Sequence, residues 1–104
     1  MADQTIKSVN PANGTLIEEF KPHTAGEVDS AIARADAAFA SWRKTGFDTR
    51  ARLLQAAAGV LEANLDRYAA TMTAEMGKPL SQARAEIRKC AWVCRHYAEH
   101  AATY

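Results

Sequence analysis

Residues 75–86 read EMGKPLSQARAE, and the three residues Gly77-Lys78-Pro79 in this stretch decide the local fold. Glycine suits the left-handed position just after a helix, and proline cannot continue a helix because it lacks a backbone N–H. Gly77 therefore predicts the end of one helix, and Ser81 is the expected N-cap of the next. The stretch indicates two consecutive helices joined by a tight turn.

The helix that begins at Ser81 carries mostly small apolar residues at heptad spacing. They are separated by four, three, four, three and four positions: Ala83, Ile87, Cys90, Cys94, Tyr97 and Ala101. This spacing predicts a seam that packs closely against a larger element. Because no Gly, Asn or Pro follows to stop the helix, we expect it to run to Tyr104 in a truncated chain.

Two further helices are expected between residues 48 and 77. Asp48 or Thr49 can cap the first of them, and Asn64 marks a break before a helix that ends at Gly77. Gly59 disfavours the earlier helix by roughly 1 kcal/mol relative to alanine, and close packing against a neighbour would explain its presence. The apolar residues of this earlier helix are Leu53, Leu54, Ala57, Val60 and Leu61.

A helix over residues 24–40 precedes these. Thr24, followed three positions later by Glu27, fits a capping box, in which each side chain bonds a backbone N–H of the other residue. Its apolar face has helical spacing and consists of Val28, Ile32, Ala35 and Phe39.

Residues 6–20 are expected to form a β-hairpin that ends before Pro22. Asn13-Gly14 supplies the two positive φ angles that a tight hairpin turn needs. An isolated hairpin is marginally stable in water, so this one should lean on other parts of the protein. The predicted fold class is therefore mostly α, with four helices in residues 24–104 and an N-terminal β-hairpin.

The composition excludes several classes of protein. The chain has 104 residues, a formal net charge of +1 and 23 alanines, whereas Val, Ile, Leu and Phe together number only 17. This length allows one domain, and the near-neutral charge argues against a nucleic-acid partner. The sequence contains no apolar run of about 18 residues, so we predict no membrane span. Residues 1–5 do not resemble a secretory leader. We expect a cytoplasmic protein with reduced thiols.

Two pairs of potential metal ligands lie at i, i+4 spacing. Cys90 and Cys94 could supply half of a zinc site, but zinc prefers four ligands, and burial as small apolar residues is the favoured interpretation. His96 and His100 could chelate a metal adventitiously, although such pairs are more often a partly exposed helix surface. His23 lies in a polar loop without an identifiable partner.

The residues alone do not identify a reaction. The sequence contains no nucleophile elbow, dinucleotide-binding glycine motif, phosphate loop or zinc-protease motif. From the residues alone we therefore predict only a soluble, mostly helical segment, and we assign no catalytic residue.

Five stretches in order resemble the NAD(P)-dependent aldehyde dehydrogenase superfamily. They are residues 9–14 (VNPANG), 28–43, 50–54, 75–86 and 97–101. The Met-Gly-Lys-Pro run and the Arg-Ala-Glu run within residues 75–86 are most similar to succinate-semialdehyde dehydrogenases. The resemblance extends over residues 6–104.

The resemblance implies that residues 1–104 form the N-terminal part of a Rossmann-like cofactor-binding domain, an incomplete piece of an α/β fold. The family oxidises an aldehyde by thiolate attack, hydride transfer to NAD or NADP and hydrolysis. Its catalytic cysteine, glutamate and asparagine and its glycine-rich loop lie downstream, so the catalytic domain is expected to be absent. Neither Cys90 nor Cys94 matches the nucleophile. We expect no catalytic residue and no cofactor binding in this segment alone.

The resemblance also implies a structural monovalent cation and a homo-oligomer, either dimer or tetramer. The cation ligands would be the backbone carbonyl of Val9 and the carboxylate of Glu75, because oxygen donors suit a hard cation. The alternative for Glu75 is a solvated carboxylate near a helix end. An alternative for the whole chain is an autonomous, non-catalytic helical interaction module that packs through the seam beyond Ser81.

Overall fold

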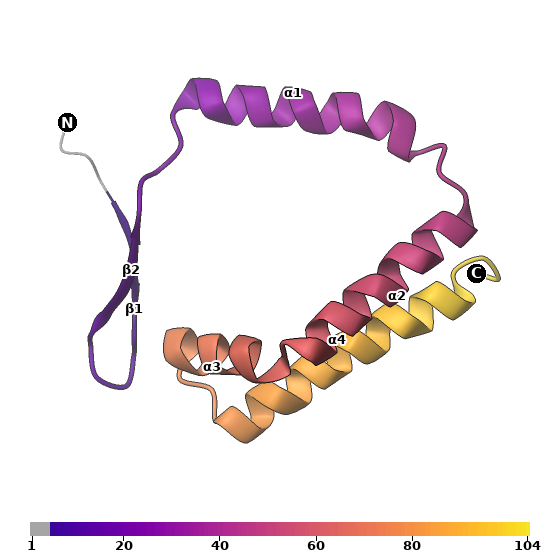
Figure 1. The fold of residues 1–104 in the computed structure, drawn as a ribbon. Coiled ribbons are helices and arrows are strands. Elements are labelled where there is room, and N and C mark those ends of the chain that lie inside the picture. The colour runs from indigo at the N-terminus through magenta and orange to yellow at the C-terminus, as the bar shows by residue number, and fades with distance from the viewer. Residues whose placement is uncertain (1–4) are drawn as a thin grey trace.

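The computed structural model describes residues 5–104, and the expectation about the leader therefore falls mostly outside the described residues. The elements in chain order are β1 (Ile6–Val9), β2 (Leu16–Phe20), α1 (Ala25–Trp42), α2 (Phe47–Ala63), α3 (Leu65–Met76) and α4 (Leu80–His100). The predicted class, four helices after an N-terminal hairpin, is confirmed for the described part of the chain (Figure 1).

The two strands pair in antiparallel fashion. Ile6 lies opposite Phe20, and the register shifts between Ser8 and Val9. A bulge of this kind bends a strand and redirects the side chains next to it. The extra residue is Ile17 of β2, opposite the step from Ser8 to Val9 near the turn.

The hairpin turn differs from the predicted one. Of the described residues other than glycine, none has a positive φ, and in this turn only Gly14 does, with φ of 73°. Asn13 instead uses its side chain, because its Oδ1 accepts from the Thr15 backbone N–H at 3.0 Å. The backbone N–H of Gly14 donates to the Asn10 carbonyl at 2.8 Å, which makes a wider loop with a single left-handed residue.

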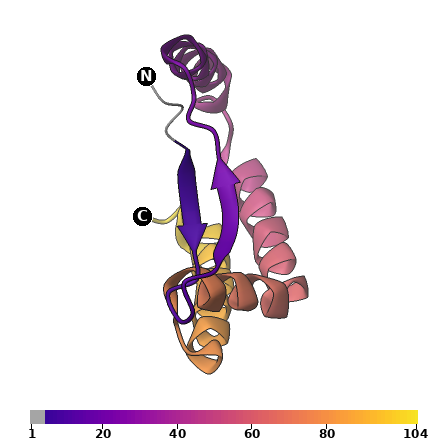
Figure 2. The same ribbon diagram turned by 90° about the vertical axis from the view of Figure 1, so that its left-hand side faces the viewer.

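Helix α1 begins as predicted and ends slightly later. The Thr24 hydroxyl accepts from the Glu27 backbone N–H at 3.2 Å, and the Glu27 carboxylate accepts from the Thr24 N–H at 2.7 Å. The helix has no buried residue, and Ile32 and Phe39 on its predicted apolar face are 63% and 57% exposed. In both views α1 lies apart from the other helices (Figures 1 and 2).

Helices α2, α3 and α4 form the packed part of the molecule. Both α2 and α3 pack against α4 (Figure 1). Small side chains let helix backbones approach closely, and alanines dominate this contact. The buried apolar residues of the described chain are Ala58, Ala69, Ala83, Ile87 and Ala91.

The predicted seam of α4 is wrong beyond Ile87. Cys90 and Tyr97 are exposed, whereas Ala91 is buried, so the contact follows four-residue steps rather than alternating steps of four and three. The helices α2 and α3 that pack against α4 decide which side of it is buried, and the spacing of its apolar residues does not contain that information. The burial predicted for Cys90 is therefore also wrong, while Cys94 is half-buried.

Three helix ends also differ from expectation. Gly46 is the N-cap of α2 without a side-chain bond, and Pro79, not Ser81, precedes α4. Asp48 falls instead in the first turn of α2, where an acidic side chain complements the helix dipole. Helix α4 stops at His100, and the Thr103 N–H donates to the His100 carbonyl at 2.9 Å in a closing turn.

The molecule is open rather than round. Its Cα radius of gyration is 18.2 Å, against about 13 Å for a compact domain of 100 residues. The extents are 47 × 41 × 21 Å, which describes the flat, ring-like outline in Figure 1. None of the helices in residues 5–104 has the length and apolar character needed to cross a bilayer.

Candidate functional site

The two residues predicted as cation ligands lie on segments that the fold brings together. The Ser8 hydroxyl donates to Glu75 Oε1 at 2.6 Å, and this bond joins the end of β1 to the last turn of α3. Val9 follows Ser8 directly. The end of β1, which carries Val9, therefore lies beside the last turn of α3, and the role of Val9 and Glu75 as cation ligands stays a prediction.

The turn after α3 contributes a second contact with the hairpin. Gly77 has φ of 71°, as its predicted role requires, and a Cβ at this position would lie 3.3 Å from Pro11 Cγ. Glycine thus permits both the left-handed end of α3 and the close approach of the hairpin loop. Through the Ser8–Glu75 bond and the approach of Pro11 to Gly77, the hairpin packs against the end of α3.

The donors at this junction are oxygens. They are the Glu75 carboxylate and the Ser8 hydroxyl, which sequence reasoning missed, and the carbonyl of Val9 belongs to the residue next to Ser8. Oxygen donors are the ligands that hard cations prefer, so the chemistry of the set fits the ion that the resemblance implies. No local pattern could have identified Ser8, because it lies 67 positions from Glu75 along the chain.

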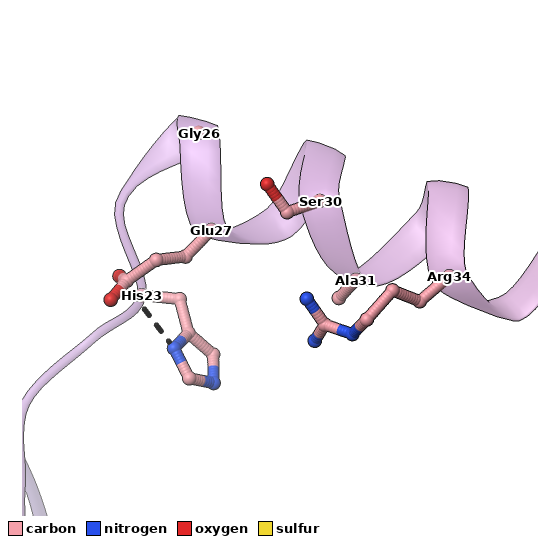
Figure 3. A pocket seen from close by; sticks show the side chains of 6 residues that line it. All are labelled: His23, Gly26, Glu27, Ser30, Ala31 and Arg34. Atoms are coloured by element: carbon pink, nitrogen blue, oxygen red, sulfur yellow. Dashed lines mark ion pairs between the residues drawn. The ribbon is translucent and has the colours of Figure 1, made fainter.

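Apart from this junction, a hollow lies along the exposed start of α1 (Figure 3). It has a volume of about 410 Å³ and is lined by His23, Gly26, Glu27, Ser30, Ala31 and Arg34. His23 Nδ1 lies 3.8 Å from Glu27 Oε2, so the prediction that His23 has no partner is wrong. The spacing of four residues was the available signal.

Glu27 in this hollow serves the helix rather than a ligand. Its backbone and side-chain hydrogen bonds with Thr24 lower the pKa of the Glu27 carboxyl, with a smaller contribution from His23. The carboxylate thus completes the capping box and faces the hollow as a negative charge. This charge disfavours an anion at the start of α1.

The remaining predicted ligands lie on α4. Cys90 and Cys94 are free thiols. The His96 and His100 rings stack with their centroids 4.5 Å apart. Within residues 5–104, no group of three or more His, Cys, Asp or Glu side chains is arranged to hold a metal ion.

Comparison with protein-family models matches residues 1–104 to the aldehyde dehydrogenase family. The chain belongs to this family. The resemblance predicted from five sequence stretches is thereby confirmed. The family assignment also accounts for a fold whose helices leave wide apolar faces uncovered.

Curated aldehyde dehydrogenases cover nearly all of this chain. The "Succinate-semialdehyde dehydrogenase [NADP(+)] 1" of Mycobacterium tuberculosis is 51% identical over 96 residues, which are 92% of this chain and 21% of that protein. The "Probable succinate-semialdehyde dehydrogenase [NADP(+)]" of Synechocystis is 43% identical over 95% of this chain and 22% of its own length. The chain spans about a fifth of the length of the curated relatives it matches.

Solved aldehyde dehydrogenases contain the same arrangement of elements. The structure described as PnpE in complex with nicotinamide adenine dinucleotide matches with a TM-score of 0.88 and 30% identity, covering 100% of this chain and 22% of that one. An aldehyde dehydrogenase from Brucella melitensis biovar abortus matches with a TM-score of 0.87 and 34% identity, covering 94% and 20%. The hairpin and four helices therefore correspond to a part of the aldehyde dehydrogenase fold.

Proposed function

We propose that these residues belong to an NAD(P)-dependent oxidoreductase that oxidises succinate semialdehyde to the acid. The 51% identity with the mycobacterial enzyme over 92% of this chain carries the proposal. The relatives named above include two that are described as NADP(+) enzymes and one solved in complex with NAD. The proposal leaves the choice between the two cofactors to experiment.

In this proposal, residues 1–104 are the N-terminal part of the cofactor-binding domain and contribute no catalytic group. A bound nicotinamide cofactor would supply the hydride acceptor for oxidation of the aldehyde. The role of the present residues is to provide a scaffold, because their uncovered apolar faces suit packing on further structure. We further propose that the segment alone neither turns over substrate nor binds NAD or NADP, and that the enzyme is a cytoplasmic homo-oligomer.

The test is an assay of aldehyde oxidation with succinate semialdehyde and each cofactor. The protein that contains these residues, purified from its native cells, should reduce NAD or NADP in the presence of succinate semialdehyde. The purified 104-residue chain should match the blank. Turnover by the 104-residue chain would overturn the proposal that it is inactive, and no turnover by the native protein would overturn the substrate.

The alternative of an autonomous helical module makes a different prediction. A sharp peak in size-exclusion chromatography, with a cooperative thermal melt in near-ultraviolet circular dichroism, would favour the module. Aggregation or a broad melt would favour a piece of a larger fold. The exposure of Ile32 and Phe39 favours the latter, because α1 buries none of its residues in the described chain.

The junction of the hairpin and α3 is the proposed cation site, with Val9 and Glu75 as ligands. The thermal midpoint of the chain should rise with NaCl or KCl relative to choline chloride at equal ionic strength. Glu75→Gln should remove this difference, because an amide binds a cation less strongly than a carboxylate does. Glu99→Gln, on α4, is the matched control and should keep the difference. Equal melting of the unmodified chain in all three salts would exclude the site.

A further inference from the structure

The last turns of α4 and the closing turn hold a row of aromatic and imidazole rings. His96 stacks on His100 with an interplanar angle of 18° and a centroid separation of 4.5 Å. On its other side His96 stacks on Trp92 at 5.5 Å. The two imidazoles therefore lie next to each other on one face of the helix, as i, i+4 spacing requires.

The hydrogen bonds of this row define the state of the His100 ring. His100 Nδ1 lies 2.8 Å from the backbone carbonyl of His96. A carbonyl only accepts, so Nδ1 carries the proton and Nε2 of the neutral ring keeps its lone pair. A backbone carbonyl that orients one ring nitrogen is the usual arrangement around a metal-binding histidine.

His96 presents its Nε2 in the same region. This nitrogen lies 2.7 Å from the hydroxyl of Tyr104, in the turn after α4. Two nitrogens that share a metal lie about 3–4 Å apart, because each bond is about 2.0 Å long. The rings are stacked at 4.5 Å in the free chain, so both must turn out of the stack, and the Tyr104 hydroxyl must move aside, before the two Nε2 atoms face one ion.

We propose that His96 and His100 form a two-nitrogen binding site for a divalent transition metal, with Cu²⁺ preferred over Ni²⁺ and Zn²⁺. Imidazole nitrogens suit these metals, and affinity for such sites rises from Ni²⁺ to Cu²⁺ and falls again at Zn²⁺. Zinc prefers four protein ligands in structural sites, whereas Cu²⁺ accepts two adjacent nitrogens with water in its remaining positions. The i, i+4 spacing lets both imidazoles reach one ion, which separates this pair from a single surface histidine.

The site is independent of the proposed dehydrogenase function. It is formed by α4 and the turn after it, whereas the proposed cation site joins the hairpin to the end of α3. Its ligands are nitrogens rather than oxygens, so the two sites select different metals. Failure of the enzyme assay would leave this proposal unchanged.

The test is titration of the 104-residue chain with CuCl₂, in a background of Cys90→Ser, Cys94→Ser and Trp42→Phe. The serines remove competing thiols, and Trp92 then reports on the site as the remaining tryptophan. We expect one Cu²⁺ to quench Trp92 fluorescence, and electron paramagnetic resonance to resolve two imidazole nitrogens on the metal.

Single substitutions identify the ligands. His96→Gln and His100→Gln should each weaken binding by roughly 10- to 100-fold, because losing one imidazole converts a chelate into a single contact. His23→Gln, at the third histidine, is the matched control and should bind as tightly as the parent. Equal binding by either α4 variant, or a spectrum with one imidazole nitrogen, would overturn the proposal and leave adventitious binding only.

Discussion

Among single residues, Gly77 is under the strictest conformational demand. Its φ of 71° is unfavourable for any residue with a Cβ, and the added atom would lie 3.3 Å from Pro11. Gly77→Ala should therefore lower the free energy of unfolding by about 1–2 kcal/mol. Urea denaturation followed by circular dichroism measures this change.

Gly59 provides the matched control for this prediction. It lies within α2, and a Cβ there would meet nothing within 4 Å, so the close packing expected at this position is absent. Gly59→Ala should stabilise the chain by about 0.5–1 kcal/mol, because alanine restricts the unfolded backbone and favours helix. Destabilisation by both substitutions alike would contradict the conformational argument for Gly77.

Glu27 predicts a dependence on pH at the start of α1. Its pKa in the folded chain lies below the ordinary value of 4.5, because the ionised carboxylate accepts hydrogen bonds from Thr24. A lowered pKa means that the carboxylate stabilises the fold above pH 4.5. This contribution is lost as the pH falls through the lowered pKa. Carboxyl NMR titration should show Glu27 below 4.5 and the start of α1 fraying as Glu27 protonates.

The Thr24→Ala variant tests the cause of this shift. It removes the hydroxyl of the capping box but keeps the backbone N–H, so the pKa of Glu27 should move part of the way toward 4.5. Glu27→Gln should abolish the acid dependence at this helix start, because an amide does not titrate in this range. An unchanged Glu27 titration in Thr24→Ala would show that the capping hydroxyl is not responsible.

Residue patterns predicted helix ends where the relevant bonds are local. The Thr24–Glu27 box and the left-handed Gly77 involve neighbouring residues, and both were predicted. Ser81 failed as an N-cap because Pro79 already occupies the extended position before α4. Asn13 failed as a left-handed residue because its side chain bonds Thr15 in a longer loop.

For whole elements, packing on α4 depends on small residues. Ala58 of α2 is fully buried, whereas its neighbour Ala57 in the same helix is exposed. Ala58→Leu should destabilise the chain by about 1–3 kcal/mol, because the larger side chain forces the helices apart. Ala57→Leu should change stability by less than about 0.5 kcal/mol.

Thermal melts of the two leucine variants make this comparison. Both add the same side chain to the same helix, so a difference in helix propensity cannot explain a difference between them. Equal midpoints for the two variants would mean that α2 does not pack on α4 through Ala58.

The existence of each element was predictable, but its packed face was less so. Residues 24–104 contain enough helical periodicity and enough stop signals to separate four helices. The buried side of α4 depends on which neighbours cover it, and α2 and α3 select Ala83, Ile87 and Ala91. The spacing of apolar residues does not show which helices cover α4. A prediction from spacing alone therefore placed Cys90 and Tyr97 on the buried side, where the structure does not have them.

For the whole molecule, the separation of α1 from the other helices predicts uneven stability. Helix α1 has no buried residue, whereas α4 has three. Backbone amides of α1 should exchange with solvent deuterium faster than those in the middle of α4, because local opening of α1 breaks few apolar contacts. Hydrogen-exchange mass spectrometry measures both rates in one experiment.

A concentration series is the control for this exchange experiment. Protection of α1 that rises with protein concentration would identify packing between copies of the chain. Protection equal to that of α4 at every concentration would contradict the open arrangement.

The candidate cation site shows how far sequence reasoning extends at this scale. Val9 and Glu75 were placed together by family resemblance, and the structure brings their segments into contact. Ser8 stayed unpredicted because its pairing depends on the bulge in β2 opposite Ser8 and Val9 and on the approach of Pro11 to Gly77. These are features of the assembled molecule rather than of any short pattern.

The bond between Ser8 and Glu75 also orders events during synthesis. The hairpin leaves the ribosome first, but its partner carboxylate is added 67 residues later. At bacterial and eukaryotic elongation rates of about 5–20 residues per second, that delay is roughly 3–13 seconds. Throughout this interval the hairpin lacks the carboxylate that joins it to α3. The first part of the chain to be made must thus wait for the end of α3 before it can form this bond.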